Sequence, residues 1–253
     1  AMSSDLAFKI ENLQVRYGSR IAVDDLNLSL RRGESLGLIG VNGAGKTSTI
    51  RSLLGMVKRK SGECSILGEK PGSIRAFQQI GFAPEEAFPP DFLSVTEYLT
   101  FCSRIKGLGR AAGKAEAADL TQWFELREHA RLGELSKGMK KRLILAQAFV
   151  GQPQLLILDE PINGLDPVMI LKLRERLQKF RQTGGSILYS SHILSEIENC
   201  CSEVAILHDG KLQRHCPIAE AKKESGSVEL LLQRVVGSPS KTSIRGGMEL
   251  HGE

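Results

Sequence analysis

Long hydrophobic runs are missing from this chain of 253 residues. Its longest purely apolar stretches span only a few residues, as at positions 155–158, whereas a helix that crosses a bilayer needs about 20. We therefore expect that the chain does not cross a membrane by itself. No charged start followed by an apolar segment is present either, so no secretory signal is predicted, and the expected location is the cytoplasm.

Paired cysteine motifs are also missing. The five cysteines make an odd count and none is spaced C-x-x-C, which argues against a disulfide framework and against a zinc knuckle. Cys200 and Cys201 are adjacent and follow an amphipathic segment. We therefore interpret them as packing residues rather than as metal ligands.

Aromatic residues are scarce, at 5% of the chain, although the formal net charge is +5. The basic residues come in small groups, at 58–60 and at Lys137, Lys140, Lys141 and Arg142, with no aromatic residues between them on which bases could stack. We predict that these groups are solvated or face phosphate, and we expect no nucleic-acid partner.

The first third of the chain has the pattern of strands followed by a glycine-rich turn. Residues 7–17 and 22–30 alternate apolar and polar side chains with a period of two, which predicts a half-buried antiparallel sheet. Residues 34–40 then lead into the glycine-rich segment. Residues 46–56 have apolar side chains at helical spacing, and this helix is expected to end at Gly55.

The middle of the chain is predicted to be helical. Residues 95–108 and 115–126 have helical patterns that are separated by a turn region from Gly107 to Gly113, and residues 135–150 form a third amphipathic pattern. We expect a helical subdomain, at about 88–150, inserted into an α/β core.

Strands and helices alternate after this insertion. The expected elements are strands at 154–160 and 186–191, helices at 167–181 and 193–199, and a strand at 203–213 that turns back at Asp209-Gly210. This order predicts an α/β fold with a largely parallel sheet covered on both faces. Beyond Ile218 we expect a short helix, a possible strand at 227–236, and a flexible polar tail at 237–253.

The glycine-rich segment carries the first chemical motif. Residues 40–47 fit G-x-x-x-x-G-K-[ST] without a gap, directly after a predicted strand and before a predicted helix. Glycines in this motif let backbone N–H groups turn toward phosphate oxygens, Lys46 reaches the β- and γ-phosphates, and the hydroxyl of Thr47 is a magnesium ligand. The predicted phosphate-binding residues are Gly40, Asn42, Gly43, Ala44, Gly45, Lys46, Thr47 and Ser48.

A pair of acidic residues carries the second motif. Asp159 and Glu160 follow four apolar residues that read as a buried strand, so they lie at the strand end where open α/β sheets bind their ligands. Asp159 suits the surroundings of a magnesium ion. Glu160 suits a general base that orients or deprotonates a water for attack on the γ-phosphate.

The third motif, LSKGMKKR, begins a predicted helix at residue 135. The hydroxyl of Ser136, backbone N–H groups and the helix N-terminus point the same way, which favours an anion. A plain helix cap needs the serine, but Gly138 weakens the helix by about 1 kcal/mol relative to alanine. Because the chain already has one phosphate loop, this second site becomes useful when it closes over a nucleotide held by another copy of the fold.

This ordered set of motifs resembles the ATP-binding cassette, the nucleotide-binding subunit of ABC transporters, over about residues 7–215. Within the resemblance, residues 40–47 correspond to Walker A, and residues 136–138, from Ser136 through Gly138, correspond to the signature. Asp159 and Glu160 correspond to the Walker B aspartate and the catalytic glutamate. The resemblance implies further that Tyr17 stacks on adenine, that Asp166 belongs to the D-loop, and that His192 is the switch histidine that contacts the γ-phosphate.

Two motifs depart from the commonest family pattern. The signature reads Ser-Lys-Gly-Met, with Lys137 and Met139 where glycine and glutamine are usual. Glu85 stands where the Q-loop usually has glutamine, since Gln78 and Gln79 lie too early in the chain to fill that role. Glu85 still offers a carboxylate oxygen to magnesium. Both variants resemble those of ABC-2-type exporters, whose membrane domain is a separate chain.

The resemblance implies an ATPase with ATP and Mg²⁺ as cofactors. Residues 1–236 are expected to form one ABC ATPase domain, with Glu160, His192 and Lys46 as its catalytic residues and with Thr47, Glu85 and Asp159 near the metal. The implied partners are a second nucleotide-binding subunit in a head-to-tail dimer, expected to be a homodimer because one chain carries every half-site, and a permease that holds the chain at the cytoplasmic face of a membrane. The alternatives are a soluble ABC ATPase acting on nucleic acid or the ribosome, and a nucleotide-binding regulator without turnover.

Overall fold

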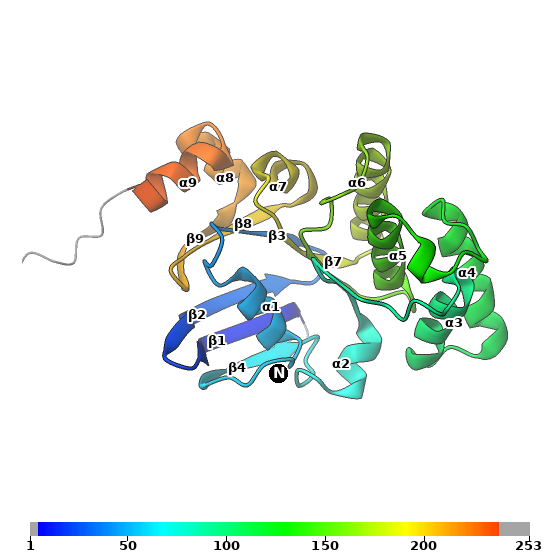
Figure 1. Ribbon diagram of the computed structural model, residues 1–253. Coiled ribbons are helices and arrows are strands. Elements are labelled where there is room, and N and C mark those ends of the chain that lie inside the picture. Colours follow the sequence, from blue (N-terminus) through cyan, green and yellow to red (C-terminus); the bar gives the residue numbers. More distant parts are fainter. Residues whose placement is uncertain (1–4, 238–253) are drawn as a thin grey trace, which may run out of the picture.

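Residues 5–237 are described by a computed structural model of the chain (Figure 1). Among these residues no helix is long and apolar enough to cross a bilayer. The predicted flexible tail at 237–253 lies, apart from its first residue, outside the described part. The described chain forms two sheets that are flanked by helices.

The smaller sheet is antiparallel and has the strand order β2-β1-β4. Its strands are β1 (Leu6–Tyr17), β2 (Arg20–Arg31) and β4 (Ser61–Ile66). The pairing of β1 with β2 runs from Leu6 opposite Arg31 to Tyr17 opposite Arg20, which confirms the two strands expected from the alternating pattern. Strand β4 was not predicted, because its buried and exposed residues do not alternate over enough positions.

The larger sheet has the order β5-β6-β7-β3-β8-β9, and all its neighbouring strands are parallel except β8 and β9. Its strands are β5 (Ile80–Ala83), β6 (Leu155–Asp159), β7 (Ser186–Ser190), β3 (Ser35–Ile39), β8 (Glu203–His208) and β9 (Lys211–Pro217). The largely parallel sheet predicted from the alternation of strands and helices is therefore confirmed.

The larger sheet separates two hydrophobic cores. In β6, Leu155 and Ile157 belong to the core shared with the antiparallel sheet, whereas Leu156 and Leu158 belong to the core on the helical side. Since successive side chains of a strand point to opposite faces, one short apolar strand fills both layers. Every residue of β3, β6 and β7 is buried as a result.

Helices flank the larger sheet. Four of those that precede or follow its strands in the sequence are α1 (Lys46–Leu53), α2 (Ile74–Gln79), α6 (Pro167–Gln182) and α7 (Leu194–Cys200). The short helix α2 was not predicted. Helix α1 ends before Gly55, which has φ +74°, so the expected stop at this glycine is confirmed.

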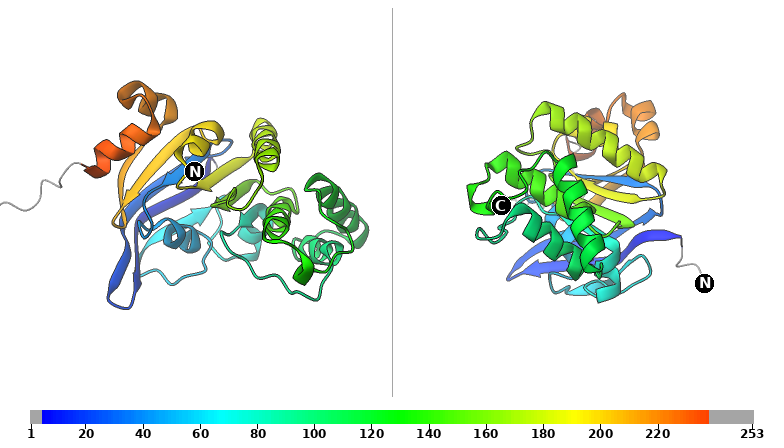
Figure 2. Two further views of the ribbon diagram at one scale, coloured as in Figure 1. Left: turned by 45° about the horizontal axis from the view of Figure 1, so that its top comes forward. Right: turned by 90° about the vertical axis from the view of Figure 1, so that its right-hand side faces the viewer.

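Three α-helices and a short 3-10 helix at Leu132–Glu134 separate β5 from β6 in the described chain. The α-helices are α3 (Val95–Ile105), α4 (Arg110–Trp123) and α5 (Lys137–Phe149). In Figures 1 and 2, α3 and α4 lie farthest from the antiparallel sheet, at one end of the molecule. The expected turn region at 107–113 is too long, since α4 begins at Arg110 and includes Gly113. A Cβ at Gly113 would lie 3.0 Å from the Cβ of Ser103 on α3, so this glycine serves close packing of two helices.

The possible strand at 227–236 is wrong. After α8 (Ile218–Ser225), the chain forms helix α9 (Val228–Gly237), which packs on α7, α8 and β8. Its buried residues Val228 and Leu231 are three positions apart and are followed by the partly buried Leu232 and Val235. This is helical spacing, which outweighs the apolar run that suggested a strand.

The interpretation of the cysteines as packing residues is supported by their burial. Cys200, Cys201 and Cys216 are buried, and all five cysteines are free. Burial raises the pKa of the Cys201 thiol well above its usual value, which keeps this thiol uncharged. The described residues contain no group of three or more His, Cys, Asp or Glu that could hold a metal ion.

Close backbone packing of β5 on α5 gives a test of the fold. A Cβ added at Gly81 would collide with the backbone carbonyl oxygen of Ala148, which cannot rotate away. Gly81→Ala should therefore lower the free energy of unfolding by about 1–3 kcal/mol or more. Thermal or urea denaturation measures this loss. The control is Gly109→Ala, where an added Cβ meets nothing within 4 Å, and it should change stability by less than about 0.5 kcal/mol. Equal effects of the two substitutions would contradict this packing.

Candidate nucleotide-binding site

One cavity, of about 800 Å³, opens at the carboxyl ends of β3, β6 and β7. It brings together most of the residues that the motifs singled out, from elements far apart in the sequence. The predicted residues that line it are Tyr17, Gly40, Asn42, Gly43, Ala44, Gly45, Lys46, Thr47, Ser48, Glu85, Asp159, Glu160 and His192. Ser136, Gly138 and Asp166 do not line it.

The glycine-rich loop joins β3 to α1 with the conformation that its sequence predicts. Gly43 has φ +84° and Gly45 has φ +106°, both in the left-handed region that favours glycine. At Gly45 a Cβ would also lie only 2.6 Å from the carbonyl oxygen of Ala22 on β2. The loop therefore wraps closely against the antiparallel sheet and leaves its other side open to the cavity.

The first two residues of α1 reach into the cavity. Lys46 is buried, with 8% of the residue exposed. Its ammonium donates to the carbonyl oxygen of Gly40 at 2.6 Å and to that of Val41 at 3.5 Å. The hydroxyl of Thr47 donates to Oδ2 of Asp159 at 3.3 Å. These contacts place a cation inside the loop and a hydroxyl beside a carboxylate, which is the arrangement that a phosphate group with a divalent cation needs.

Asp159 is held from two sides at the end of β6. Its Oδ2 accepts from Thr47, and its Oδ1 accepts from the hydroxyl of Ser190, the last residue of the neighbouring strand β7. Asp159 is 2% exposed. Sequence reasoning missed Ser190, although its position at the end of a predicted strand at 186–191 could have indicated it.

Glu160 follows in an unusual backbone conformation. Its φ is +47°, in the left-handed region that non-glycine residues rarely adopt. The backbone N–H of Glu160 donates to the carbonyl oxygen and the hydroxyl of Ser190, at 3.1 and 3.3 Å. Its carboxylate oxygen Oε2 lies 2.9 Å from Nδ1 of His192, whose side chain is 57% exposed. A buried carboxylate and an accessible imidazole thus form a hydrogen-bonded pair at the cavity.

Two side chains mark the outer wall of the cavity near β1. Tyr17 ends β1 and is 45% exposed, so its ring face is accessible to a flat ligand. Arg20 begins β2 and lies close enough that a Cβ at Gly43 would be 3.1 Å from its Nη2. Arg20 was not among the predicted residues, and its separation from the glycine loop in the sequence gave no signal of this contact.

Glu85 connects the large cavity to a smaller one of about 420 Å³. Thr47, Glu85 and Asp159 line both cavities. Their hydroxyl and carboxylate oxygens are the hard donors that Mg²⁺ prefers, and this cation usually keeps water and phosphate oxygens as its other ligands. The three residues therefore fit a magnesium ion that is held together with a nucleotide.

Lys141 is not solvated, contrary to the prediction for its basic group. It is 7% exposed, and its ammonium donates to the carbonyl oxygens of Pro84 and Glu85, both at 3.3 Å. Burial lowers the pKa of Lys141, while the carboxylates of Asp159, Glu85 and Glu160 act to raise it. The helical spacing of α5 turns this lysine toward the core, where carbonyl groups and carboxylates take the place of water.

A second group of predicted residues lies at the starts of α5 and α6. Ser136 caps α5 by accepting from the N–H of Met139 at 3.3 Å, and it is exposed. Asp166 caps α6 by accepting from the N–H of Met169 at 3.0 Å. That bond and the guanidinium of Arg142, 2.5 Å away, hold the pKa of Asp166 below its usual value.

The starts of these two helices are adjacent. A Cβ at Gly138 would lie 3.0 Å from the carbonyl oxygen of Gly164, just before α6, and Arg142 bridges from α5 to Asp166. Arg142 also reaches Glu125 at 3.1 Å, after α4. Ser136, Gly138 and Asp166 therefore lie close together in the chain, and none of them lines the cavity described above.

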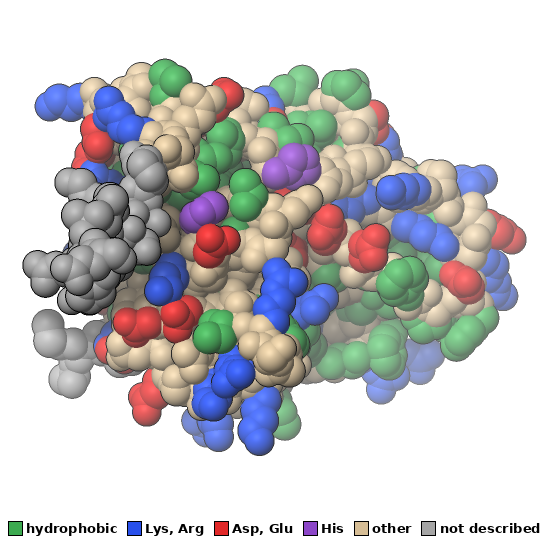
Figure 3. All heavy atoms as spheres, turned by 60° about the vertical axis from the view of Figure 1, so that its left-hand side comes forward, with side chains coloured by type: hydrophobic (Ala, Val, Ile, Leu, Met, Phe, Trp, Pro, Cys, Tyr) green, Lys and Arg blue, Asp and Glu red, His purple; other side chains and the backbone are tan. Residues whose placement is uncertain are grey.

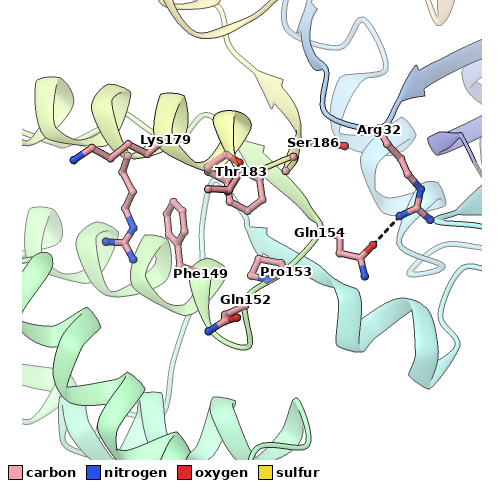
Figure 4. Close-up of a pocket in the computed structure, with 12 residues that line it drawn as sticks. Arg32, Phe149, Gln152, Pro153, Gln154, Lys179, Thr183 and Ser186 are labelled. Atoms are coloured by element: carbon pink, nitrogen blue, oxygen red, sulfur yellow. Dashed lines mark hydrogen bonds between the residues drawn. The ribbon is translucent and has the colours of Figure 1, made fainter.

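Another cavity, of about 670 Å³, lies at the opposite edge of the larger sheet (Figure 4). It is bounded by Gln154 and Ser186, which stand at the amino ends of β6 and β7, and by Phe149 and Thr183 near the ends of α5 and α6. Arg32 donates to Gln154 at its rim, at 2.7 Å. Because ligands of open α/β sheets bind at the carboxyl ends of the strands, this cavity is not the candidate site.

Comparisons with known proteins agree with this geometry. The family model described as "ABC transporter" matches residues 23–163. The chain is 39% identical over 221 residues to "Nod factor export ATP-binding protein I" of Burkholderia orbicola (strain AU 1054), covering 85% of this chain and 72% of the relative. It is 38% identical over 223 residues to "Bacitracin transport ATP-binding protein BcrA" of Bacillus licheniformis, covering 86% of this chain and 72% of that protein.

Solved structures show the same fold. "Structure of ATP binding subunit of ABC transporter" matches with a TM-score of 0.85 and 30% identity, over 91% of this chain and 99% of that one. The "Dimeric structure of a post-hydrolysis state of the ATP-binding cassette MJ0796 bound to ADP and Pi" matches with a TM-score of 0.76 and 20% identity, over 83% and 98% of the two chains. The chain therefore belongs to the ABC transporter family, as an ATP-binding subunit.

Proposed function

We propose that two copies of this chain bind ATP head to tail and drive a separate membrane permease that works as an exporter. In each half of the dimer, the cavity of one copy holds ATP and Mg²⁺, while Ser136 and Gly138 of the other copy cap the γ-phosphate. The observation that carries this proposal is the separation of the two groups. One chain has a complete phosphate cavity, but its exposed Ser136 and its Asp166 lie outside that cavity.

The residues of the cavity have distinct roles in this proposal. Tyr17 stacks on adenine, and the loop residues 40–48 bind the phosphates through their N–H groups. Lys46 places a positive charge beside the β- and γ-phosphates. This charge stabilises the negative charge that develops on the phosphate oxygens in the transition state. Magnesium, when bound by Thr47, Asp159 and Glu85, neutralises phosphate charge.

Glu160 and His192 are proposed to prepare the attack of water on the γ-phosphate. The Glu160 carboxylate accepts the proton of the water or orients it, and its buried position keeps competing water away. The hydrogen bond at 2.9 Å to His192 Nδ1 fixes the imidazole so that its other nitrogen is able to face the phosphate. Closure by the second copy would complete this water-poor site.

The exporter assignment comes from the relatives. Their names include "Nod factor export ATP-binding protein I", "Bacitracin transport ATP-binding protein BcrA" and, in Bacillus subtilis (strain 168), "Linearmycin resistance ATP-binding protein LnrL", which is 34% identical over 206 residues. We infer that residues 1–236 act as one ABC ATPase domain, with the helical subdomain at 88–150, and that the permease holds this domain at the cytoplasmic face of a membrane.

An apolar groove of about 680 Å³ is the proposed contact with the permease. It is lined by exposed side chains of α2 and α3, among them Ile74, Phe77 and Phe101, which are 77%, 49% and 55% exposed. Exposed apolar patches of this kind mark partner sites, and a groove between helices suits an amphipathic helix. Met56 and Phe82 line both this groove and the small cavity of Glu85, so a partner here would sense the nucleotide site.

The same groove carries a cation. Lys106 lies at its wall, where its ammonium donates to the carbonyl oxygens of Phe77 and Ile80 and sits 4.3 Å from the centre of the Phe77 ring. Burial lowers the pKa of Lys106 to about 8. An amphipathic permease helix that carries an acidic side chain would complement this groove in both shape and charge.

A nucleic-acid partner is not part of the proposal. The three α-helices between β5 and β6 are 11, 14 and 13 residues long, which is too short for the long coiled coil of ABC ATPases that act on DNA. On the face shown in Figure 3, Lys and Arg side chains are mixed with Asp and Glu side chains rather than gathered in one basic stripe. These features favour the transporter over a ribosome- or DNA-associated ATPase.

The stacking role of Tyr17 gives the first prediction about function. Tyr17→Ala should weaken ATP binding by about 1–3 kcal/mol, or roughly 5- to 150-fold in Kd, because the adenine loses its aromatic contact. Isothermal calorimetry measures this change. Tyr17→Phe keeps the ring and should bind ATP like the parent, and inorganic triphosphate should bind all three proteins equally. If Tyr17→Ala binds ATP as tightly as the parent, adenine does not stack there.

The shared site is tested by mixing two inactive chains. Lys46→Ala removes the phosphate cation and Ser136→Arg blocks the cap, so each variant alone should lose at least about 100-fold in ATPase rate. In an equal mixture half the dimers are mixed, and each of those has one intact site, so about a quarter of the parent rate should return. In the control, Lys46→Ala is mixed with the double variant Lys46→Ala/Ser136→Arg. No activity should return, because every chain in that mixture lacks Lys46. A mixture that stays inactive, or full activity of Ser136→Arg alone, would refute the head-to-tail dimer.

The permease contact is tested by photo-crosslinking in the native cell. The crosslinking amino acid p-benzoylphenylalanine at Phe101, in the groove, should capture a membrane protein with several spanning helices, identified by mass spectrometry. The matched control is Leu230 on α9, which is 51% exposed but lies at the other end of the molecule (Figure 1). The groove assignment fails if both positions capture the same protein or if neither does.

A further inference from the structure

Lys141 is a buried cation for which the proposed reaction has no role. It lies on α5, just over one turn after Ser136, and its side chain runs inward to the loop that follows β5. There its ammonium donates to the carbonyl oxygens of Pro84 and Glu85. A lysine is almost never this buried unless its charge is paired, so the position calls for a function.

Few backbone hydrogen bonds hold the loop that contains Glu85. Among the described residues, the backbone of residues 85–88 makes no other hydrogen bond. Glu85 and Glu86 are exposed. The rest of the loop is joined to the helical region farther on, where the carbonyl oxygen of Asp91 accepts from the N–H of Gly133 at 3.1 Å. The two hydrogen bonds from Lys141 thus attach the backbone of the Glu85 segment to α5, and the partly buried side chain of Ala87 packs against the core just after it.

The surroundings of the ammonium explain why a lysine is tolerated there. The carboxylates of Asp159, Glu85 and Glu160 are close enough to favour its charged form. Lys141 therefore links a loop that carries one carboxylate to the strand end that carries the other two.

We propose that Lys141 is a positioning residue that ties the Glu85 loop to α5 and so sets where Glu85 stands relative to Thr47 and Asp159. The proposal rests on the proposed function in one respect, namely that Glu85 acts at the magnesium site. Ser136 lies at the start of the same helix. Lys141 therefore also connects the helix end that would contact the neighbouring copy with the loop that carries Glu85.

The attachment itself is tested on the isolated chain without nucleotide. A Glu-specific protease cleaves after Glu85 and Glu86, and Lys141→Met should speed this cleavage about tenfold or more, because an anchoring hydrogen bond to a charged group is lost. Cleavage after Glu128, which is exposed and remote from Lys141, is the internal reference. Lys114→Gln is the control, since Lys114 is an exposed lysine on α4 and not on the two segments that Lys141 joins. An unchanged cleavage rate in Lys141→Met would overturn the proposal.

The action through Glu85 is tested by a double-mutant cycle on the ATPase rate. Lys141→Met should lower kcat about tenfold in the parent but less than about twofold in a Glu85→Ala background, where there is no side chain left to position. Lys141→Arg, which keeps the charge and the donors, should restore most of the rate. A loss by the same factor in both backgrounds would show that Lys141 does not act through Glu85.

Two precautions keep the outcome clear. Circular dichroism establishes that each variant is folded, and if Lys141→Met is not, Lys141→Gln replaces it in both experiments with the same expectations. The proteolysis needs neither a dimer nor a permease, so it fails or succeeds independently of the mixing experiment. A failed mixing experiment together with faster loop cleavage would overturn the proposed dimer and leave the loop attachment in place.

Discussion

The chemistry of this chain depends on three neighbouring buried strands, β6, β7 and β3, that run in the same direction. Their shared direction brings the glycine loop, the Asp159–Glu160 pair and His192 to one edge of the sheet, although these groups are spread over residues 40–192 of the sequence. The strands hold this register because their alternating side chains fill the cores on both faces. The hydrogen bonds of Ser190 to Asp159 and Glu160 then fix one strand end against the next.

The parts of this arrangement that were predictable from the sequence are those coded by local patterns. The glycine loop has its own spacing, buried strands have apolar runs, and the ordered motifs name the family. Where a local pattern was ambiguous the prediction failed. The apolar run at 227–236 forms helix α9 because its buried residues have helical spacing, and Gly113 lies inside α4 because a neighbouring helix needs the space.

Contacts between distant segments were not predictable. The approach of Arg20 to the glycine loop, the bond of Ser190 to Asp159, and the burial of Lys141 all depend on how elements pack. From the sequence alone, Lys141 is one of four basic residues at the start of a predicted helix. Only the fold shows that Lys141 points inward, to the carbonyl oxygen of Pro84, while Lys140 pairs with Asp91 on the surface. Helix α5 therefore has two different ends of interest, an exposed cap at Ser136 and an internal anchor one turn later.

The left-handed backbone of Glu160 has a consequence for how the protein balances stability against chemistry. A non-glycine residue in this region raises the energy of the folded chain by roughly 1–2 kcal/mol. That cost falls on the residue whose carboxylate faces the histidine and the phosphate cavity. The fold thus stores a small conformational strain at the rim of the cavity. The pairing of the Glu160 carboxylate with His192 is held in place at a small cost in folding free energy.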